Sequence, residues 1–148
     1  MQSNCNISNP PDTIPALSVI YQPVTALAAY PRNARIHSKH QIRQIAASIT
    51  AFGFANPILV DRENTIVAGH GRLLAAQMLG MEQVPTIRLE TLTEAQIRAY
   101  VLADNKLARN AGWDKSILAI ELEHLLTINE RFDVTITGFE IPEIDLIL

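Results

Sequence analysis

The chain has 148 residues, of which 48% are hydrophobic and 18% charged, and a net charge of −3 at pH 7. This length predicts a single domain, and this composition excludes an intrinsically disordered chain. A single cysteine, Cys5, excludes an internal disulfide framework and a zinc site built from cysteines. The sequence contains neither a signal peptide nor an apolar run of about 18 residues, so we expect a soluble, cytoplasmic protein that does not enter a membrane.

The charged residues are unevenly distributed. Residues 13–60 contain no acidic side chain, whereas residues 113–148 contain eight acids and two bases, a net charge of −6. The bases of the first region that could contact DNA phosphates are Arg32, Arg35, Lys39 and Arg43. Such contacts predict that the protein binds DNA weakly and in a salt-dependent manner, or binds it with the help of a partner. The alternative is that these bases form an ordinary solvated surface. The acidic region would repel nucleic acid.

Helical and extended patterns alternate along the chain. Residues 1–17, rich in Asn, Ser and Pro, are expected to form a disordered leader, followed by a short strand at 18–21. The clearest helix begins after the N-cap residue Ser38, places its apolar residues on one face and ends at Gly53. Short strands are expected at residues 57–60 and 65–68, joined as a hairpin, and at residues 84–89.

Further helices are expected at residues 73–79, at 93–108 behind a capping box of Thr93 and Gln96, and at 114–126 behind Asp114. A short extended piece and a helix led by Pro142 complete the chain. This order predicts the α+β class, with a small mixed sheet, interleaved helices and a helical C-terminal part. The expected division is a leader at 1–17, a nucleotide- or phosphate-binding domain at 18–127, and a C-terminal extension or start of a linker at 128–148.

The most informative stretch is the glycine turn Gly69-His70-Gly71-Arg72, which follows a strand and leads into a helix. The two glycines would permit positive φ and let backbone amides approach a ligand. The helix N-terminus directs amides and a positive dipole at the turn, and the Arg72 guanidinium suits phosphate oxygens. This predicts a small phosphate-binding turn in which His70 donates a hydrogen bond or transfers a proton. The spacing matches neither a Walker loop nor a dinucleotide fingerprint, and a tight turn with a solvent-facing arginine is the alternative.

Two other segments carry candidate polar groups. Asn33 and Arg35 lie in a loop that could bind phosphate or ribose. The pair Asp104-Asn105 lies near the end of a predicted helix, where both side chains compete for backbone hydrogen bonds, and this favours either a functional role or a contact between helices. His37 and His40 lack further metal ligands nearby and are expected to be solvated.

Taken in order, these motifs resemble the ParB/sulfiredoxin superfamily. The resemblance covers residues 24–126 and is strongest to the ParB N-terminal, or ParB-like nuclease, domain of phage and mobile-element proteins, often found beside a DNA methyltransferase. The segments that carry it are residues 33–35, 53–60, 68–72, 79–85 and 104–105.

The resemblance implies a nucleoside triphosphate, CTP or ATP, bound with Mg²⁺. The Gly-Glu-Arg-Arg box of partition proteins corresponds to residues 69–72, of which only Gly69 and Arg72 are kept. The Gln-Pro-Arg box corresponds to residues 33–35 and keeps Arg35, and the Glu-Asn box corresponds to Asp104-Asn105. The implied nucleotide-binding residues are Asn33, Arg35, Gly69, His70, Gly71, Arg72 and Asn105, with Asp104 as the metal ligand. Sulfiredoxins carry a nucleophilic cysteine where this chain has His70, which excludes that reaction.

Three functions remain open from the sequence. The first is a nucleotide-binding domain in DNA partition, DNA modification or plasmid and phage DNA metabolism. The second is a Mg²⁺-dependent nuclease or nucleoside triphosphatase, with His70 as acid or base and Asp104 on the metal. The third is a non-catalytic module for a DNA methyltransferase. A homodimer is a further expected assembly. Residues 113–148 are not expected to form a recognition module, which leaves a stand-alone domain or the N-terminal piece of a longer protein.

Overall fold

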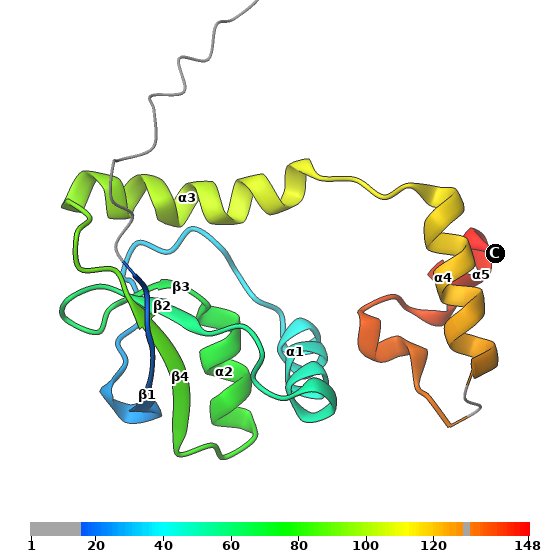
Figure 1. The fold of residues 1–148 in the computed structure, drawn as a ribbon, viewed down its shortest axis with the longest axis horizontal. Helices are drawn as coiled ribbons and strands as arrows, with labels where there is room; N and C mark the ends of the chain where they lie inside the picture. The colour runs from blue at the N-terminus through cyan, green and yellow to red at the C-terminus, as the bar shows by residue number, and fades with distance from the viewer. Residues whose placement is uncertain (1–15, 129–130) are drawn as a thin grey trace, which may run out of the picture.

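The computed structural model describes residues 16–128 and 131–148 of the chain (Figure 1). The predicted leader at 1–17 lies almost entirely outside the described residues, so its disorder stays a prediction. No helix among residues 16–128 and 131–148 is long and apolar enough to cross a membrane.

A four-stranded mixed sheet lies at the centre of the N-terminal part, with the strand order β1-β4-β2-β3. The strands are β1 (Val19–Pro23), β2 (Ile58–Val60), β3 (Ile66–Ala68) and β4 (Gln83–Arg88). The β2–β3 pair is the predicted hairpin and is antiparallel, β1 is antiparallel to β4, and β2 runs parallel to β4. In the hairpin turn the Asp61 carboxylate accepts hydrogen bonds from the amides of Glu63 and Thr65, which explains the tight polar connection.

Two helices pack against each other beside the sheet, α1 (Lys39–Phe52) and α2 (His70–Met78). The α1 helix has the predicted ends, because the Ser38 hydroxyl accepts the Gln41 amide and Gly53 has a φ of 79°. The α2 helix starts earlier than expected, at His70 rather than at residue 73. The main core contains the fully or almost fully buried side chains Val24, Ile58, Val60, Ile66, Leu73, Ala76 and Val84.

The α3 helix (Glu94–Asn110) begins at the predicted capping box, in which Thr93 and Gln96 bond each other's backbone amides, and packs on β3. An extended segment then leads to α4 (Lys115–Ile128), the 3-10 turn η2 (Val134–Thr137) and α5 (Ile141–Ile147). Figure 1 shows these three elements as a C-terminal unit at the far end of α3. The expected extended piece after residue 132 is thus a 3-10 turn, capped by the Asp133 carboxylate.

The C-terminal unit has a small core of its own, formed by Leu122, Val134 and Ile144. It contacts the N-terminal part through α1, where the His40 Nε2 lies 2.7 Å from the Glu140 Oε1 and the Gln44 amide donates to the same oxygen at 3.0 Å. The α+β class and the helical C-terminal part predicted from the sequence are confirmed.

Candidate functional site

A cavity of about 440 Å³ is bounded by α1, α2, α3 and the loop at residues 30–37. It brings together segments that lie up to 75 residues apart in the sequence, from Asn33 to Ala108. The predicted nucleotide and metal residues all line it: Asn33, Arg35, Gly69, His70, Gly71, Arg72, Asp104 and Asn105. Their common location is what the resemblance implied, and their roles stay predictions.

The two glycines of the turn serve different purposes. Gly69 is the N-cap of α2 with a φ of 110°, and a Cβ on it would lie 2.9 Å from the Arg72 Nη2, so its bare backbone lets the guanidinium fold back over the turn. Gly71 has no positive φ, so the backbone freedom expected at both glycines is used at Gly69 alone of the two. A Cβ on Gly71 would lie 2.9 Å from the Ile45 Cδ1 and 3.0 Å from the His37 Cε1, so this glycine lets α1 approach α2 closely.

Arg72 lines the cavity and has one buried hydrogen-bond donor that is unused. Its side chain is half-buried and its Nη2 donates to the Pro57 carbonyl at 3.1 Å, while its Nε is buried and has no partner among the described residues. Burial lowers the pKa of Arg72, and the nearby Asp104 and Tyr100 act in the opposite direction. A buried donor without an acceptor is unfavourable, so this guanidinium is suited to an anionic ligand.

His70 is held by the loop rather than free in the cavity. The Tyr30 backbone N–H donates to its Nε2 at 3.1 Å, so Nε2 carries a lone pair and the neutral ring carries its proton on Nδ1. Burial, and secondarily the neighbouring His37, lower the pKa of His70. The nitrogen that could act as a base is therefore already an acceptor in this structure.

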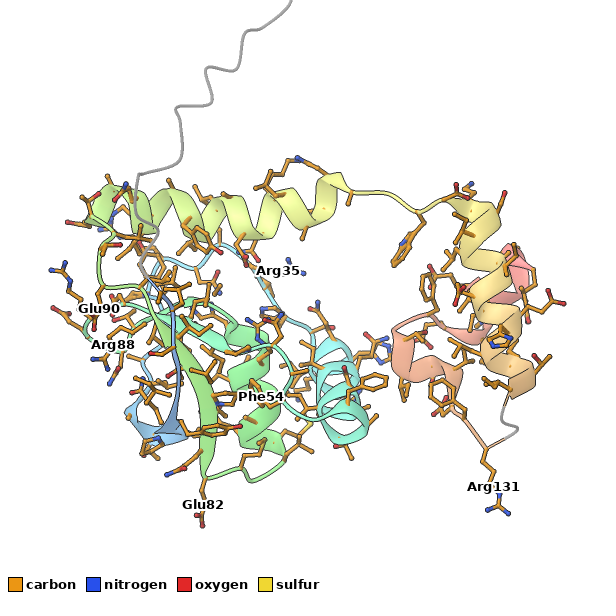
Figure 2. All side chains as sticks on the ribbon, in the orientation of Figure 1. Arg35, Phe54, Glu82, Arg88, Glu90 and Arg131 are labelled. Atoms are coloured by element: carbon orange, nitrogen blue, oxygen red, sulfur yellow. The ribbon has the colours of Figure 1, made fainter. Side chains whose placement is uncertain are left out.

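Arg35 and the two asparagines form a connected set. The Arg35 Nη1 donates to the Asn105 Oδ1 at 3.1 Å, and the Asn105 Nδ2 donates to the Val101 carbonyl at 2.8 Å, one turn earlier in α3. Within the loop, the Asn33 Oδ1 accepts the Arg35 amide at 3.2 Å. Figure 2 shows Arg35 between α3 and α1, the two helices that flank it. The asparagine amides thus hold the loop and its guanidinium, and this explains the helix-internal Asn105.

Asp104 is the one acidic residue among those that line the cavity, and its side chain is exposed. Over residues 16–128 and 131–148, no group of three His, Cys, Asp or Glu side chains is arranged to hold a metal ion. A single carboxylate does not form a closed metal site, but it fits Mg²⁺ that is bound mainly through the phosphates of a nucleotide.

Four polar cavity residues were not predicted from the sequence: His37, Gln41, Asn56 and Tyr100. His37 is half-buried rather than solvated, and its Nδ1 donates to the Gln41 Oε1 at 3.0 Å. The expectation of a solvated pair is correct for His40, which is exposed, and wrong for His37. No local pattern indicates this difference, because the burial of His37 depends on the packing of α1 against Gly71.

The four bases expected to contact DNA do not lie together. Arg32 lines a separate hollow with Asp61 and Glu63, and Arg35 lines the central cavity. Arg43 faces the C-terminal unit beside Asp133 and Glu140, while Lys39 is the first residue of α1. Their role in DNA binding stays a prediction, and the structure distributes them over different surfaces.

Comparison with known families gives two matches. Residues 13–105 match the ParB N-terminal domain, and residues 116–148 match the ParB-methyltransferase HTH (helix-turn-helix) domain. The chain belongs to the ParB N-terminal domain family. The predicted membership of the ParB N-terminal domain family is therefore confirmed.

Two curated proteins are similar to this ParB domain in sequence. It is 48% identical over 80 residues to the ParB-like nuclease domain-containing protein YnaK of Escherichia coli (strain K12), covering 54% of this chain and 92% of that protein. It is 38% identical over 68 residues to a protein of Deinococcus radiodurans named "Probable chromosome 2-partitioning protein ParB", covering 44% of this chain and 23% of that protein.

Solved structures of the C-terminally truncated ParB from Caulobacter crescentus share the fold. The complex with CTP-gamma-S superimposes with a TM-score of 0.71 at 24% identity, over 86% of this chain and 74% of the other. The complex with the centromeric parS site gives a TM-score of 0.51 at 21% identity, over 86% and 69%. The ParB-like architecture predicted from the sequence is confirmed.

The helix-turn-helix match contradicts the expectation that residues 113–148 contain no recognition module. That expectation rested on the acidic charge of the region, and charge governs the choice of partner rather than the fold. The physical basis of a separate C-terminal module is its own apolar core, to which α4, η2 and α5 each contribute one buried residue.

Proposed function

We propose that this ParB domain binds a nucleoside triphosphate, CTP in the first place, in the cavity between α1, α2 and α3. The phosphates would lie at the turn of residues 69–72, and the domain would act in the cytoplasm in the partition, modification or maintenance of plasmid or phage DNA. The observation that carries the proposal is the buried Arg72 Nε, which has no acceptor in the described part of the chain.

Three further features support an anionic ligand. The first-turn amides of α2 begin at His70, and a helix N-terminus of this kind favours negative charge. Arg35 is held at the same cavity by Asn105, which provides a second guanidinium. The similar Caulobacter crescentus ParB was solved with a CTP analogue.

Mg²⁺ is part of the proposal because the donor set suits it. Asp104 would be the one carboxylate of the chain beside the metal, and the remaining ligands would be phosphate oxygens and water. When bound, the ion would neutralise phosphate charge that Arg35 and Arg72 do not compensate. The carboxylate of Asp104 would hold the ion on the α3 side of the cavity.

DNA and a methyltransferase are proposed as partners through the C-terminal unit. The similar Caulobacter crescentus ParB was solved with parS, and residues 116–148 match a helix-turn-helix domain of the ParB-methyltransferase type. A homodimer is proposed on the same grounds of family. The net charge of −6 over residues 113–148 argues that DNA affinity requires bases from elsewhere in the assembly.

The deciding experiment is calorimetric titration of the purified chain with CTP, ATP and GTP, each with and without Mg²⁺ and duplex DNA. We expect saturable binding of at least one triphosphate, with CTP tightest, and tighter binding with Mg²⁺. Inorganic phosphate is the control for a simple anion site. Absence of binding for all three nucleotides would refute the proposal and favour the non-catalytic module.

A further inference from the structure

The loop that presents Arg35 is attached to the phosphate-binding turn at its first residue. Tyr30 begins this loop, and its backbone N–H donates to the His70 Nε2 at 3.1 Å across 40 residues of sequence. Tyr30 is half-buried, and the structure gives its amide no other acceptor among the described residues. A single side chain therefore satisfies the amide at the start of the loop.

Two local hydrogen bonds carry this attachment forward to Arg35. The Asn33 amide donates to the Tyr30 carbonyl at 3.1 Å, which closes a turn with Pro31 at its second position. The Asn33 Oδ1 then accepts the Arg35 amide at 3.2 Å. These two bonds connect the Tyr30 peptide to the Arg35 amide through Asn33, so the position of Tyr30 constrains where Arg35 stands.

The other end of the connection is equally constrained. His70 is the first residue of α2, and it lies between Gly69, which is left-handed, and the helical Gly71. A Cβ on Gly71 would collide with Ile45 and His37, so α2 lies in close contact with α1 and the residue before it at this point. The imidazole thus connects the start of α2 to the backbone of the loop.

We propose that His70 is a positioning residue, whose Nε2 holds the Tyr30 amide and thereby places Arg35 at the cavity opposite Arg72. The inference rests on the proposed nucleotide binding for its functional consequence, but the attachment itself exists without a ligand. It assigns His70 a role different from the proton transfer considered from the sequence. In this role the neutral ring is required as an acceptor, and its Nδ1 proton is not transferred.

The geometry defines a discriminating set of variants. Glutamine can place its amide oxygen at the position of the imidazole Nε2, whereas asparagine ends nearer the backbone, at the position of Nδ1. His70→Gln therefore keeps an acceptor for Tyr30, and His70→Asn and His70→Ala remove it. His124→Gln is the matched control, because His124 is exposed on α4 and does not line the cavity.

Two measurements on the full chain test the proposal. The first is the exchange rate of the Tyr30 amide proton by NMR without nucleotide, and the second is the CTP affinity by calorimetry. We expect His70→Asn and His70→Ala to accelerate the exchange and to weaken CTP binding about 2- to 10-fold, the range that corresponds to one lost hydrogen bond. We expect His70→Gln to stay within about twofold of the parent in both, as His124→Gln should.

The two parts fail separately. If Tyr30 exchange is the same in the parent and in His70→Ala, the attachment is refuted, whatever the nucleotide data show. If His70→Gln weakens CTP as much as His70→Ala while Tyr30 remains protected, His70 contacts the nucleotide directly and the positioning role is refuted. If the exchange follows the expected order but no triphosphate binds to the parent, the attachment stands and the proposed function fails.

Discussion

Removal of the Arg72 guanidinium is the most direct perturbation of the proposed site. Arg72→Ala deletes a donor to the Pro57 carbonyl and a buried Nε that has no partner in the described residues. With a triphosphate bound, this guanidinium would make charge-assisted bonds, which contribute roughly 1.5–3 kcal/mol. We therefore expect triphosphate affinity to fall about 10- to 150-fold.

The effect of the same substitution on stability should be small. Losing the charge-assisted bond to Pro57 costs about 1.5–3 kcal/mol, but removing a buried donor without an acceptor relieves a cost of about 1–3 kcal/mol. These terms oppose each other, so we expect the free energy of unfolding to change by less than about 1 kcal/mol. For a chain of this length the Tm should shift by less than about 4 °C.

Calorimetric titration with CTP and thermal denaturation of one variant measure both quantities. Arg88→Ala is a matched control, because Arg88 also has a buried Nε without a partner and donates through its Nη2 to the Asn64 Oδ1 at 2.7 Å. Arg88 does not line the cavity, and Figure 2 shows it beside Glu90, well away from Arg35. An Arg72→Ala variant with a lower Tm and an unchanged titration would refute the phosphate-binding role.

Three other outcomes follow from the same contacts. The first is a double-mutant cycle on CTP affinity, in which Asn105→Ala should have little effect once Arg35→Ala is present. The reason is that the side-chain oxygen of Asn105 bonds Arg35 and its side-chain nitrogen bonds the Val101 carbonyl. If the two losses of affinity are additive, Asn105 contacts the ligand directly. Without nucleotide, the free energy of unfolding should decrease as pH falls below 6.5, because the lowered pKa of His70 means that the unfolded chain binds the additional proton first. His70→Gln should remove this part of the pH dependence, which denaturant titrations at several pH values would measure. An unchanged dependence of the free energy of unfolding on pH would contradict the prediction. Asp104→Ala should abolish the increase in CTP affinity that Mg²⁺ causes, without changing CTP affinity measured in the presence of a chelator. The purified protein should not nick plasmid DNA. Nicking by the parent that is lost in Asp104→Ala would instead favour the nuclease function.

Those parts of the fold that depend on neighbouring residues could be predicted from the sequence. Ser38 and Gly53 delimit α1, and Thr93 with Gln96 starts α3, because caps are satisfied by side chains within three or four residues. The start of α2 was misplaced by three residues, since a glycine-rich sequence carries no strong helix signal.

The contacts that define the site could not be predicted from local patterns. The Arg35–Asn105 bond joins residues 70 positions apart, and the His70–Tyr30 bond joins residues 40 positions apart. Gly71 illustrates the difficulty, because its sequence context suggests backbone freedom whereas its actual constraint is the proximity of Ile45 and His37. The family resemblance indicated which residues would share a site, and the packing of α1, α2 and α3 supplies the reason.

The C-terminal unit should be energetically separable from the nucleotide cavity. It has its own apolar core, and its polar contact with α1 is the exposed pair of His40 and Glu140, assisted by Gln44. Exposed ion pairs contribute at most about 1 kcal/mol, so a His40→Ala variant, which leaves the Glu140 N-cap of α5 intact, should lose less than this in thermal denaturation. None of these three residues lines the cavity, and CTP affinity should therefore stay within about twofold of the parent. A larger loss of affinity in calorimetry would mean that α1 couples the position of the C-terminal unit to the cavity. The coupling would act through Gln41, which lies in α1, and His37, which precedes it, because both line the cavity.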